Sequence, residues 1–346
     1  MQRIPPGMNP GASAALARRV AGTRVADGAT ELPITVDQTN HSVVVGESVV
    51  VKWLRSPAPP PHRGAQVLAH LAAVGFDEVP AFLGAPEVDG LVVAVLSAYV
   101  PGSRDGWDWY VDELTIAFER GDISRPIATA TRIGALAARL HRALSTPSTV
   151  LPEPCGRATC DDEYRRGREL LDEAVRVTPG AAGERLAARA ARLGDDIETL
   201  HAVGAIDTQP IHGDLHVGQL LRGGQSDGEI LVTDFDGDPV TAPRDVGRDG
   251  VERRSAMVDL ASLVQSVDHV ARVVARWRPD LAEQVGPFVA GASDRVVEAY
   301  AELGTVDERV LKPLRAIQEL HELVYAAQVL PRWRYAPDAA LASLYP

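Results

Sequence analysis

The chain has 346 residues, 45% of them hydrophobic, and a formal net charge of -12 at pH 7. This length is enough for two lobes with separate cores, and the negative charge argues against binding to nucleic acid through a basic surface. The sequence shows neither a signal-peptide pattern nor an apolar run of membrane-spanning length, so we expect a cytoplasmic protein without membrane contact.

The early part of the chain has the pattern of a small sheet with helices. Alternating apolar and β-branched residues predict strands, and apolar residues three and four positions apart predict helices. The glycine-containing turn at residues 46–48 joins two of the strands as a hairpin. The expected elements are a helix starting within residues 12–20, strands over 31–36, 41–45, 48–54, 79–88 and 91–100, and an amphipathic helix over 65–76.

A hinge is expected at Tyr99–Ser103, because proline and glycine interrupt the pattern where strand character stops. Helical periodicity dominates after it. The segments HGDLH and TDFDGD are expected to be the only non-helical part of this larger lobe. The predicted helices cover residues 108–121, 123–144, 161–176, 182–204, 256–277, 281–303 and 307–330.

The two non-helical segments gather oxygen-bearing side chains. Asp214 and Gln219 precede one short apolar run, and Asp234 ends the next. Two short strands in a hairpin would bring these three side chains to one end. Carboxylate and amide oxygens suit hard cations such as Mg²⁺, whose remaining ligands are water and substrate phosphates. We therefore expect a phosphoryl-transfer site that uses Mg²⁺.

A zinc hydrolase is the rival interpretation of HGDLH. His212 and His216 flank Asp214 at a spacing that metal ligands use. Zinc would need further nitrogen or sulfur ligands, whereas DFDGD offers oxygen only. We expect His212 to pack against the Asp234 loop as a structural histidine, and His216 either to be structural or to face the substrate. Asp259 is expected to be a buried acid that fixes the metal-binding loop.

The same segments carry a family resemblance. HGDLHVGQLL followed by VTDFDGDP resembles the catalytic and metal-binding loops of the aminoglycoside-phosphotransferase-like kinases. Most of that family has asparagine at the position of Gln219, whereas the bacterial maltokinases have glutamine there, as this chain does. Four further segments also resemble maltokinase segments: QTNHSVVVGESVVVKWLR, GFDEVPAFLGA, DGWDWYVDEL and YAAQVLPRW. Within this group the chain is most similar to the actinobacterial glucosamine kinases.

The resemblance covers most of the chain and implies an α+β, bilobal, protein-kinase-like fold. Residues 1–98 would form an N-terminal cap and nucleotide-binding lobe, 99–103 the hinge, and 104–346 a helical lobe with the catalytic and sugar-binding site. It also implies that Asp214 is the catalytic residue and that Gln219 and Asp234 hold Mg²⁺. Since an aspartate is a weak base, Asp214 would mainly orient the attacking hydroxyl.

The nucleotide-binding residues follow from the same resemblance. Lys52 stands at the position of the phosphate-binding lysine, although from composition alone it would reach toward a sheet edge. The preceding hairpin has one glycine, Gly46, so phosphate contacts are expected from residues such as Asn40, His41 and Ser42, or from fewer groups. The helix after Lys52 contains no glutamate to pair with it, so either another acid substitutes or the nucleotide alone positions the lysine.

The sugar is expected to contact residues near the end of the chain. In the maltokinases a lysine and two tyrosines hold the disaccharide, and these align with Gln318, His321 and Tyr325, which argues against maltose. Glu319 and Glu322 would favour a cationic amino group if they face the sugar, and are otherwise solvated. The implied substrate residues are Asp214, His216, Gln318, His321, Glu322, Tyr325 and Trp333.

We therefore expect an ATP-dependent sugar kinase, specifically a glucosamine kinase that phosphorylates the 6-hydroxyl of D-glucosamine. Its partners would be ATP and an amino sugar or other small sugar, and the chain would be a monomer or weak dimer. The alternatives are a maltokinase acting on the anomeric hydroxyl, an aminoglycoside phosphotransferase with the same catalytic residues, and a nucleotide-binding pseudokinase, which the missing helix glutamate allows.

Overall fold

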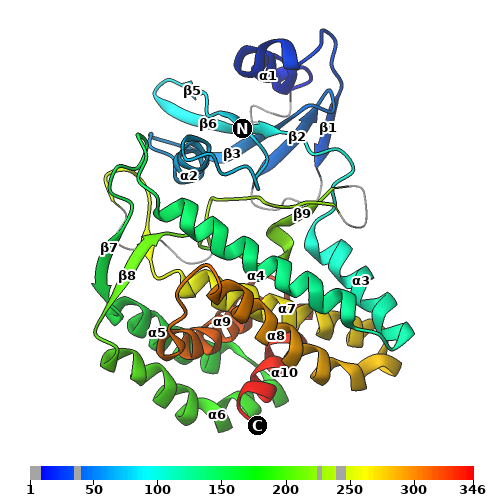
Figure 1. Ribbon diagram of the computed structural model, residues 1–346, viewed down its shortest axis with the longest axis vertical. Helices are drawn as coiled ribbons and strands as arrows, with labels where there is room; N and C mark the ends of the chain where they lie inside the picture. The colour runs from blue at the N-terminus through cyan, green and yellow to red at the C-terminus, as the bar shows by residue number, and fades with distance from the viewer. Residues whose placement is uncertain (1–8, 35–39, 224–227, 239–246) are drawn as a thin grey trace. The chain divides into compact units, whose positions relative to one another are not determined.

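The computed structural model describes residues 9–34, 40–223, 228–238 and 247–346. They form two compact units, each built from several stretches of the chain (Figure 1). The segment around Asp234 belongs to the first unit, and the segment around Asp214 belongs to the second. The first unit contains Met1–Arg104, Thr146–Pro154 and Leu221–Glu252, and the second contains Asp105–Ser145, Cys155–Leu220 and Arg253–Pro346.

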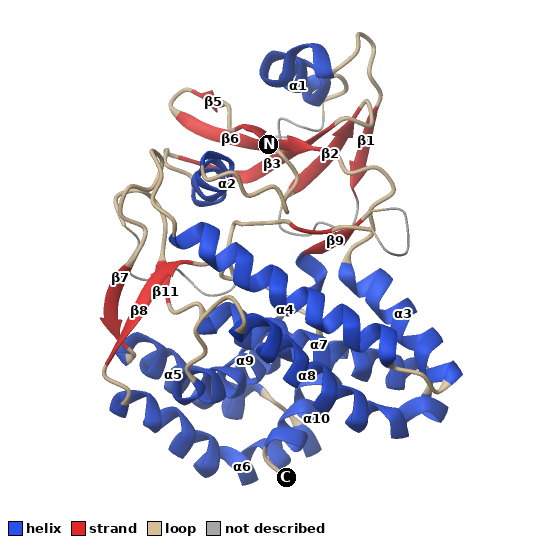
Figure 2. Ribbon diagram, viewed as in Figure 1, coloured by secondary structure: helices blue, strands red, loops and turns tan. Residues whose placement is uncertain are grey.

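The first unit is built on an antiparallel sheet with the order β1-β2-β3-β6-β4, and β5 pairs with β6 (Figure 2). The expected strands are confirmed, except that residues 79–88 form two short strands instead of one; the end of the first predicted strand, at 35–36, lies outside the described residues. The strands are β1 Glu31–Ile34, β2 His41–Val45, β3 Val49–Ala58, β4 Phe82–Gly84, β5 Glu87–Val88 and β6 Leu91–Ala98.

The hairpin between β2 and β3 sets the position of Lys52. Gly46 and Glu47 have φ angles of 55° and 49°, so both central turn residues are left-handed, as in the tight turns that match strand twist. The resulting register places Ser42 opposite Lys52. The predicted hairpin is thus confirmed, and it aligns two of the expected nucleotide-binding residues.

Two helices pack on this sheet. Helix α1 (Ala12–Ala21) shares a core with Val51 and Trp53, whereas α2 (Arg63–Ala73) shares a second core with Leu54. Because consecutive strand residues point to opposite faces, the two helices lie on opposite sides of β3. Lys52 alternates with Val51 and Trp53, which places it on the α2 face.

The second unit is mostly helical, and all seven predicted helices are confirmed (Figure 2). An eighth helix near the C-terminus was not predicted; it has only 10 residues and gains its stability by packing on α7 and α9. The helices of this unit are α3 Gly106–Arg120, α4 Ser124–Ser145, α5 Asp161–Val177, α6 Gly180–Glu198, α7 Met257–Trp277, α8 Val285–Ala301, α9 Glu308–Gln328 and α10 Tyr335–Leu344.

The prediction of a single non-helical island in the later chain was wrong. A three-stranded sheet with the order β11-β8-β7 also belongs to the second unit. Its strands are short and largely polar, so hydrophobic alternation did not reveal them. The remaining strands are β7 Gly156–Thr159, β8 Ala205–Pro210, β9 Leu220–Arg222, β10 Ile230–Val232 and β11 Arg253–Arg254, where β9 pairs with β10.

Short 3₁₀ helices complete the described elements. They are η2 Gly22–Arg24, η3 Thr199–Ala202, η4 Val217–Gln219, η5 Pro279–Gln284 and η6 Pro331–Trp333. Within the described ranges, none of the helices combines the length and the apolar character that crossing a membrane requires.

Candidate functional site

Lys52 lies on β3 with its ammonium group between two carboxylates of the first unit. The Nζ atom is 2.6 Å from Oδ1 of Asp234 and 3.0 Å from Oδ2 of Asp236. Burial lowers the pKa of Lys52, but attraction to the two carboxylates outweighs burial and raises the pKa above its ordinary value. The side chain is therefore a fixed cation, not a lysine that reaches past a sheet edge into water. We call Lys52, Asp234 and Asp236 the Lys52 centre.

The loop after β10 supplies both acids. Asp234 has a φ angle of 61°, a left-handed conformation that costs a residue other than glycine about 1–3 kcal/mol. Such strain persists only where the surrounding structure imposes it, and here it turns the carboxylate to Lys52. Asp236 was not among the predicted site residues. The repeated aspartate of the DFD pattern was the signal that could have found it.

The other expected nucleotide-binding residues lie on or beside β2. Ser42 is opposite Lys52 in the strand register but is only 5% exposed. His41 is opposite Trp53 and half-buried. Asn40 donates from Nδ2 to Oδ2 of Asp236 over 3.0 Å. The structure thus joins Asn40 to the Lys52 centre directly, and contacts of His41 and Ser42 with a nucleotide stay predictions.

In the second unit, Ile211–Gln219 forms a loop that we call the Asp214 loop. Asp259 on α7 is 1% exposed and accepts hydrogen bonds from the backbone nitrogens of His212, at 2.6 Å, and Gly213, at 2.8 Å. Burial raises the pKa of Asp259, but hydrogen bonds and nearby histidines outweigh it and hold the pKa below its ordinary value. Asp259 is the buried supporting acid that we expected, but these bonds fix the Asp214 loop and not the metal-binding loop.

His141 on α4 completes this support and was missed by the sequence reasoning. Its Nε2 atom is 3.0 Å from Oδ2 of Asp259, and its Nδ1 atom is 2.8 Å from the hydroxyl of Tyr300. The backbone oxygen of His141 accepts a hydrogen bond from Gln209, at the end of β8 just before the loop. One buried histidine therefore ties three elements to the base of the Asp214 loop.

Asp214 is half-buried, and the histidines on either side of it have different roles. His212 is fully buried, and its Nδ1 atom accepts a hydrogen bond from the backbone nitrogen of Asp214 over 3.3 Å. His216 accepts one from Gly218, and its Nε2 atom lies 3.8 Å from Oδ2 of Asp214. His212 is therefore structural, but this bond lies within its own loop, and packing of His212 against the Asp234 loop stays a prediction. His216 lies beside the predicted catalytic carboxylate.

The predicted metal ligands are divided between the units. Asp234 belongs to the first, and Gln219 to the second, where its amide nitrogen faces Nε2 of His216 at 3.4 Å and so turns the amide oxygen elsewhere. The convergence of Asp214, Gln219 and Asp234 around one ion stays a prediction. Within the described parts of the chain, no three His, Cys, Asp or Glu side chains are grouped to hold a metal ion. The described residues therefore give the zinc interpretation no support.

Several predicted substrate residues meet near the C-terminal end of α9. Gln318 donates from Nε2 to Oε1 of Glu322 at 3.2 Å, and Trp333 donates from Nε1 to Oε2 of Glu322 at 2.8 Å. Burial raises the pKa of Tyr325, and the negative charges of Glu322 and Asp214 add to this effect. Tyr325 therefore lies within electrostatic reach of both carboxylates. We call Gln318, Glu322, Tyr325 and Trp333 the late-helix cluster.

Trp107 extends this cluster toward the Asp214 loop. Its ring lies 5.3 Å from the ring of Trp333, edge to face, and 6.2 Å from that of His216. Trp109 and Tyr110 are instead buried in the core. Of the three aromatic residues at the start of α3, Trp107 is thus the one that lies against the rings of His216 and Trp333. His321 lies half-buried on α9 just before Glu322.

Glu319 neither faces the solvent nor lies free to contact a sugar, the two roles considered for it. It is fully buried, 3.0 Å from Nε2 of His269, and it also accepts a hydrogen bond from Gln265. Attraction to Glu319 outweighs the effect of burial and raises the pKa of His269 to about 9. The ring of His269 in turn lies 5.5 Å from that of Trp333. Glu319 therefore supports the late-helix cluster from inside the core, and the solvated interpretation was wrong for it.

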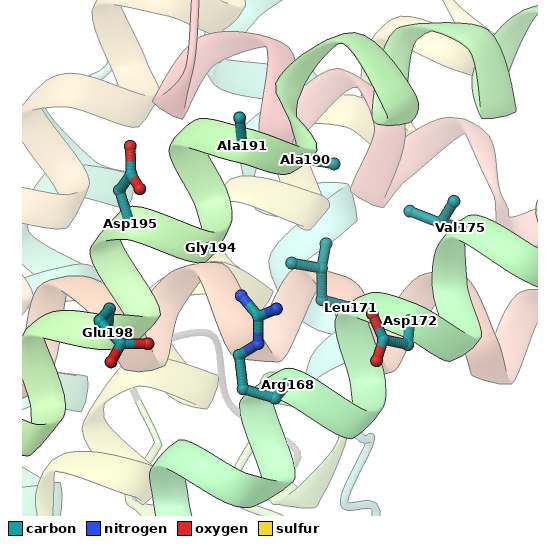
Figure 3. A pocket seen from close by; sticks show the side chains of 9 residues that line it. All are labelled: Arg168, Leu171, Asp172, Val175, Ala190, Ala191, Gly194, Asp195 and Glu198. Atoms are coloured by element: carbon teal, nitrogen blue, oxygen red, sulfur yellow. The ribbon is translucent and has the colours of Figure 1, made fainter.

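The second unit has two hollows that contain neither Asp214 nor the late-helix cluster. Figure 3 shows the first, of about 470 Å³, between α5 and α6, where none of the predicted site residues is found. Arg168, Asp172, Asp195 and Glu198 give it a mixed charge. The second, of about 410 Å³, is lined in part by His141 and Tyr300, which belong to the network that supports the Asp214 loop.

Known proteins resemble the chain in both sequence and structure, although no protein-family model matches it. A glucosamine kinase from Streptacidiphilus jiangxiensis is 40% identical over 333 residues, which cover 91% of this chain and 74% of that protein. A solved glucosamine kinase in complex with glucosamine, ADP and inorganic phosphate is 36% identical with a TM-score of 0.79, covering 98% of this chain and 84% of that one.

A more distant likeness concerns the fold alone. The GDP complex of wild-type aminoglycoside 2'-phosphotransferase-IIIa is 13% identical with a TM-score of 0.51, and the match covers 96% of each chain. The expected aminoglycoside-phosphotransferase-like fold class, with a sheet-containing N-terminal part and a mostly helical remainder, is confirmed.

Proposed function

The chain belongs to the glucosamine kinases, and from this premise we propose that it transfers the γ-phosphoryl group of ATP to the 6-hydroxyl of D-glucosamine. One observation carries the proposal at the level of residues. Aromatic rings connect the predicted catalytic carboxylate to the acid of the late-helix cluster within the second unit. Trp333, which donates a hydrogen bond to Glu322, lies 5.3 Å from Trp107. Trp107 in turn lies 6.2 Å from His216, which is 3.8 Å from Asp214.

Asp214 orients the attacking hydroxyl in this proposal. Two backbone hydrogen bonds to Asp259 hold its loop, so the carboxylate is positioned before substrate arrives. His216, whose Nε2 atom is 3.8 Å away, is a neighbouring group able to share a proton with it. Positioning and electrostatic stabilisation supply most of the rate acceleration in phosphoryl transfer. Removal of the proton by a general base increases the rate by a further factor of about 10²–10⁴.

Lys52 binds a phosphate of ATP, and Asp234 and Gln219 are the proposed ligands of Mg²⁺. The residues fit this ion, because both offer hard oxygen donors and the carboxylate of Asp234 is partly exposed. When bound, Mg²⁺ neutralises charge on the phosphates. Lys52 contributes a fixed positive charge of its own, since two carboxylates keep it protonated.

Glu322 recognises the amino group of the sugar. Trp333 and Gln318 each donate a hydrogen bond to one of its carboxylate oxygens, which fixes the orientation of the group. A carboxylate held in this way pairs well with the ammonium of glucosamine and has no such partner on glucose. The exposed parts of Trp107 and Trp333 offer aromatic surface for the sugar ring.

A coupled assay of ATP turnover over glucosamine, glucose, maltose and aminoglycosides tests the proposal. Glucosamine should give the highest kcat/KM, with product phosphorylated at the 6-hydroxyl as determined by NMR. Turnover with maltose alone would identify a maltokinase, and turnover with an aminoglycoside alone an antibiotic kinase. Binding of ATP without turnover on any acceptor would identify a pseudokinase. Any of these three results would refute the proposal.

A further inference from the structure

Helix α2 offers Lys52 no acidic partner, because its eleven residues, RGAQVLAHLAA, contain neither aspartate nor glutamate. Kinases with a lysine on the third strand commonly hold it with a glutamate from the helix that follows. We propose that Asp236 replaces this glutamate, positioning Lys52 for ATP, and that the N-terminal turn of α2 holds Asp236 in place. This inference rests on the proposed function, since it assumes that Lys52 binds ATP.

The first support is the set of contacts around the Asp236 carboxylate. Its Oδ2 atom lies 3.0 Å from Nζ of Lys52 and accepts a hydrogen bond from Nδ2 of Asn40, also at 3.0 Å. The side-chain oxygen of Asn40 in turn accepts from the backbone nitrogen of Arg55 on β3, at 3.2 Å. Asp236 is therefore tied to the strand that carries Lys52 by a route independent of the lysine.

The second support is the close approach of α2 to the same carboxylate. A Cβ atom added to Gly64, the second residue of the helix, would lie 2.3 Å from Oδ1 of Asp236. Arg63, the first residue of the helix, donates from Nη1 to the backbone oxygen of Phe235. The positive end of the helix thus faces a carboxylate, a favourable arrangement. Glycine at 64 is what allows the contact.

The third support is a difference between the partners of Asp236 and those of Asp234. Asp234 is also bonded to Lys52, but in the proposed function it holds the metal ion, so its charge serves two cations. Asp236 is joined to Lys52, Asn40 and the start of α2, which are all parts of the ATP-binding unit. Asp236 is therefore the acid whose contacts suit a positioning role, with Lys52 acting on the nucleotide.

The experiment combines Asp236→Asn, Asp236→Glu, Lys52→Met and the double variant Asp236→Asn with Lys52→Met. Two quantities are measured: steady-state KM and kcat for ATP and glucosamine, and the Kd of a fluorescent non-hydrolysable ATP analogue. Glu87→Gln, an exposed acid of the same unit, is the control for loss of charge. Thermal unfolding of each variant reports whether the fold persists.

Asp236→Asn should weaken binding of the analogue and raise the KM for ATP by about 10-fold, the loss expected for one charge-assisted hydrogen bond, while the KM for glucosamine stays unchanged. Asp236→Glu should restore part of the affinity. The double variant should bind ATP no more weakly than Lys52→Met alone, because a residue that acts through Lys52 has no effect without it. Additive losses would overturn the proposal.

Gly64→Ala tests the role of α2 without changing any charge. The added methyl group must displace Asp236, so the affinity for ATP should fall in the same direction as in Asp236→Asn. Gly286→Ala is the matched control, since Gly286 is also the second residue of a helix, α8, and its added Cβ meets nothing within 4 Å. Unchanged affinity in Gly64→Ala would refute the part played by α2.

A magnesium titration distinguishes positioning from metal binding. If Asp236→Asn shifts only the half-saturating concentration of Mg²⁺ and leaves binding of the analogue without metal unchanged, Asp236 is a metal ligand and the inference is wrong. If the unmodified protein binds ATP but does not phosphorylate glucosamine, the proposed function fails, while the binding measurements still decide the role of Asp236. Should Asp236→Asn unfold, Gly64→Ala and Asp236→Glu provide the same binding comparison.

Discussion

The Lys52 centre of the first unit and the Asp214 loop of the second are held by different kinds of interaction. In the Lys52 centre, side-chain charges of opposite sign meet at partly exposed positions. In the Asp214 loop, backbone nitrogens donate to Asp259, which is buried with His141. Charges near water can exchange partners when a ligand arrives, whereas a buried hydrogen-bonded network cannot do so cheaply. Changes in the first should therefore affect ligand affinity, and changes in the second turnover and stability.

The largest effect is expected at the tip of the Asp214 loop. Asp214→Asn keeps the size of the side chain but removes the charge that orients the hydroxyl, so kcat should fall about 10³-fold. The melting temperature should stay within about 1 °C of the unmodified protein, because the substitution keeps the size of a half-buried side chain and leaves the backbone bonds to Asp259 in place. Quenched-flow and steady-state assays measure kcat. Full activity in this variant would remove Asp214 from the mechanism.

Asp259→Ala sharpens the comparison at the base of the same loop. It leaves the backbone nitrogens of His212 and Gly213 and the buried ring of His141 without their shared acceptor, which should cost about 3–5 kcal/mol of unfolding free energy. Urea denaturation measures this, and kcat should fall together with stability. Glu302→Gln, an exposed acid of the same unit, is the control and should change neither. An equal loss of unfolding free energy in both variants would show that the bonds to Asp259 do not contribute specifically to stability.

A pH effect is expected from the pair behind the late-helix cluster. Glu319 raises the pKa of His269 from 6.5 to about 9, so the folded state binds its proton more tightly than the unfolded state. This contribution is fully present below pH 6.5 and is lost as the pH rises toward 9. Unfolding free energy measured between these values should fall by on the order of 2 kcal/mol. In Glu319→Gln this slope should flatten, and an unchanged slope would assign it to other groups.

The smallest effect concerns sugar choice. Glu322→Gln keeps the hydrogen-bonding shape but removes the negative charge, so the KM for glucosamine should rise about 10-fold while that for glucose stays the same. Tyr345→Phe, which removes the hydroxyl bonded to Asp196 elsewhere in the second unit, should leave both constants unchanged. Comparable losses for glucosamine and glucose would indicate general packing and not recognition of the amino group.

Prediction from sequence succeeded where the signal is local. Periodicity located the strands around Lys52 and the seven long helices, because alternation and helical spacing reflect which face of an element is buried. It failed for β7 and β8, whose polar residues carry little alternation, and for α10, which depends on packing against other helices. The chemistry of the Asp214 loop was visible because its residues are close together in the chain.

The sequence by itself determined the strands around Lys52, the seven long helices, the candidate loops and the residue types suited to phosphoryl transfer. Only the tertiary structure decided which charges are paired: Lys52 with acids 182 residues away or more, Asp259 with His141, and Glu319 with His269. The physical reason is that pairing depends on distance and burial in space, while neither periodicity nor composition records which distant segments come into contact. The absent glutamate of α2 was therefore evident from the sequence, but Asp236 beside Lys52 was not.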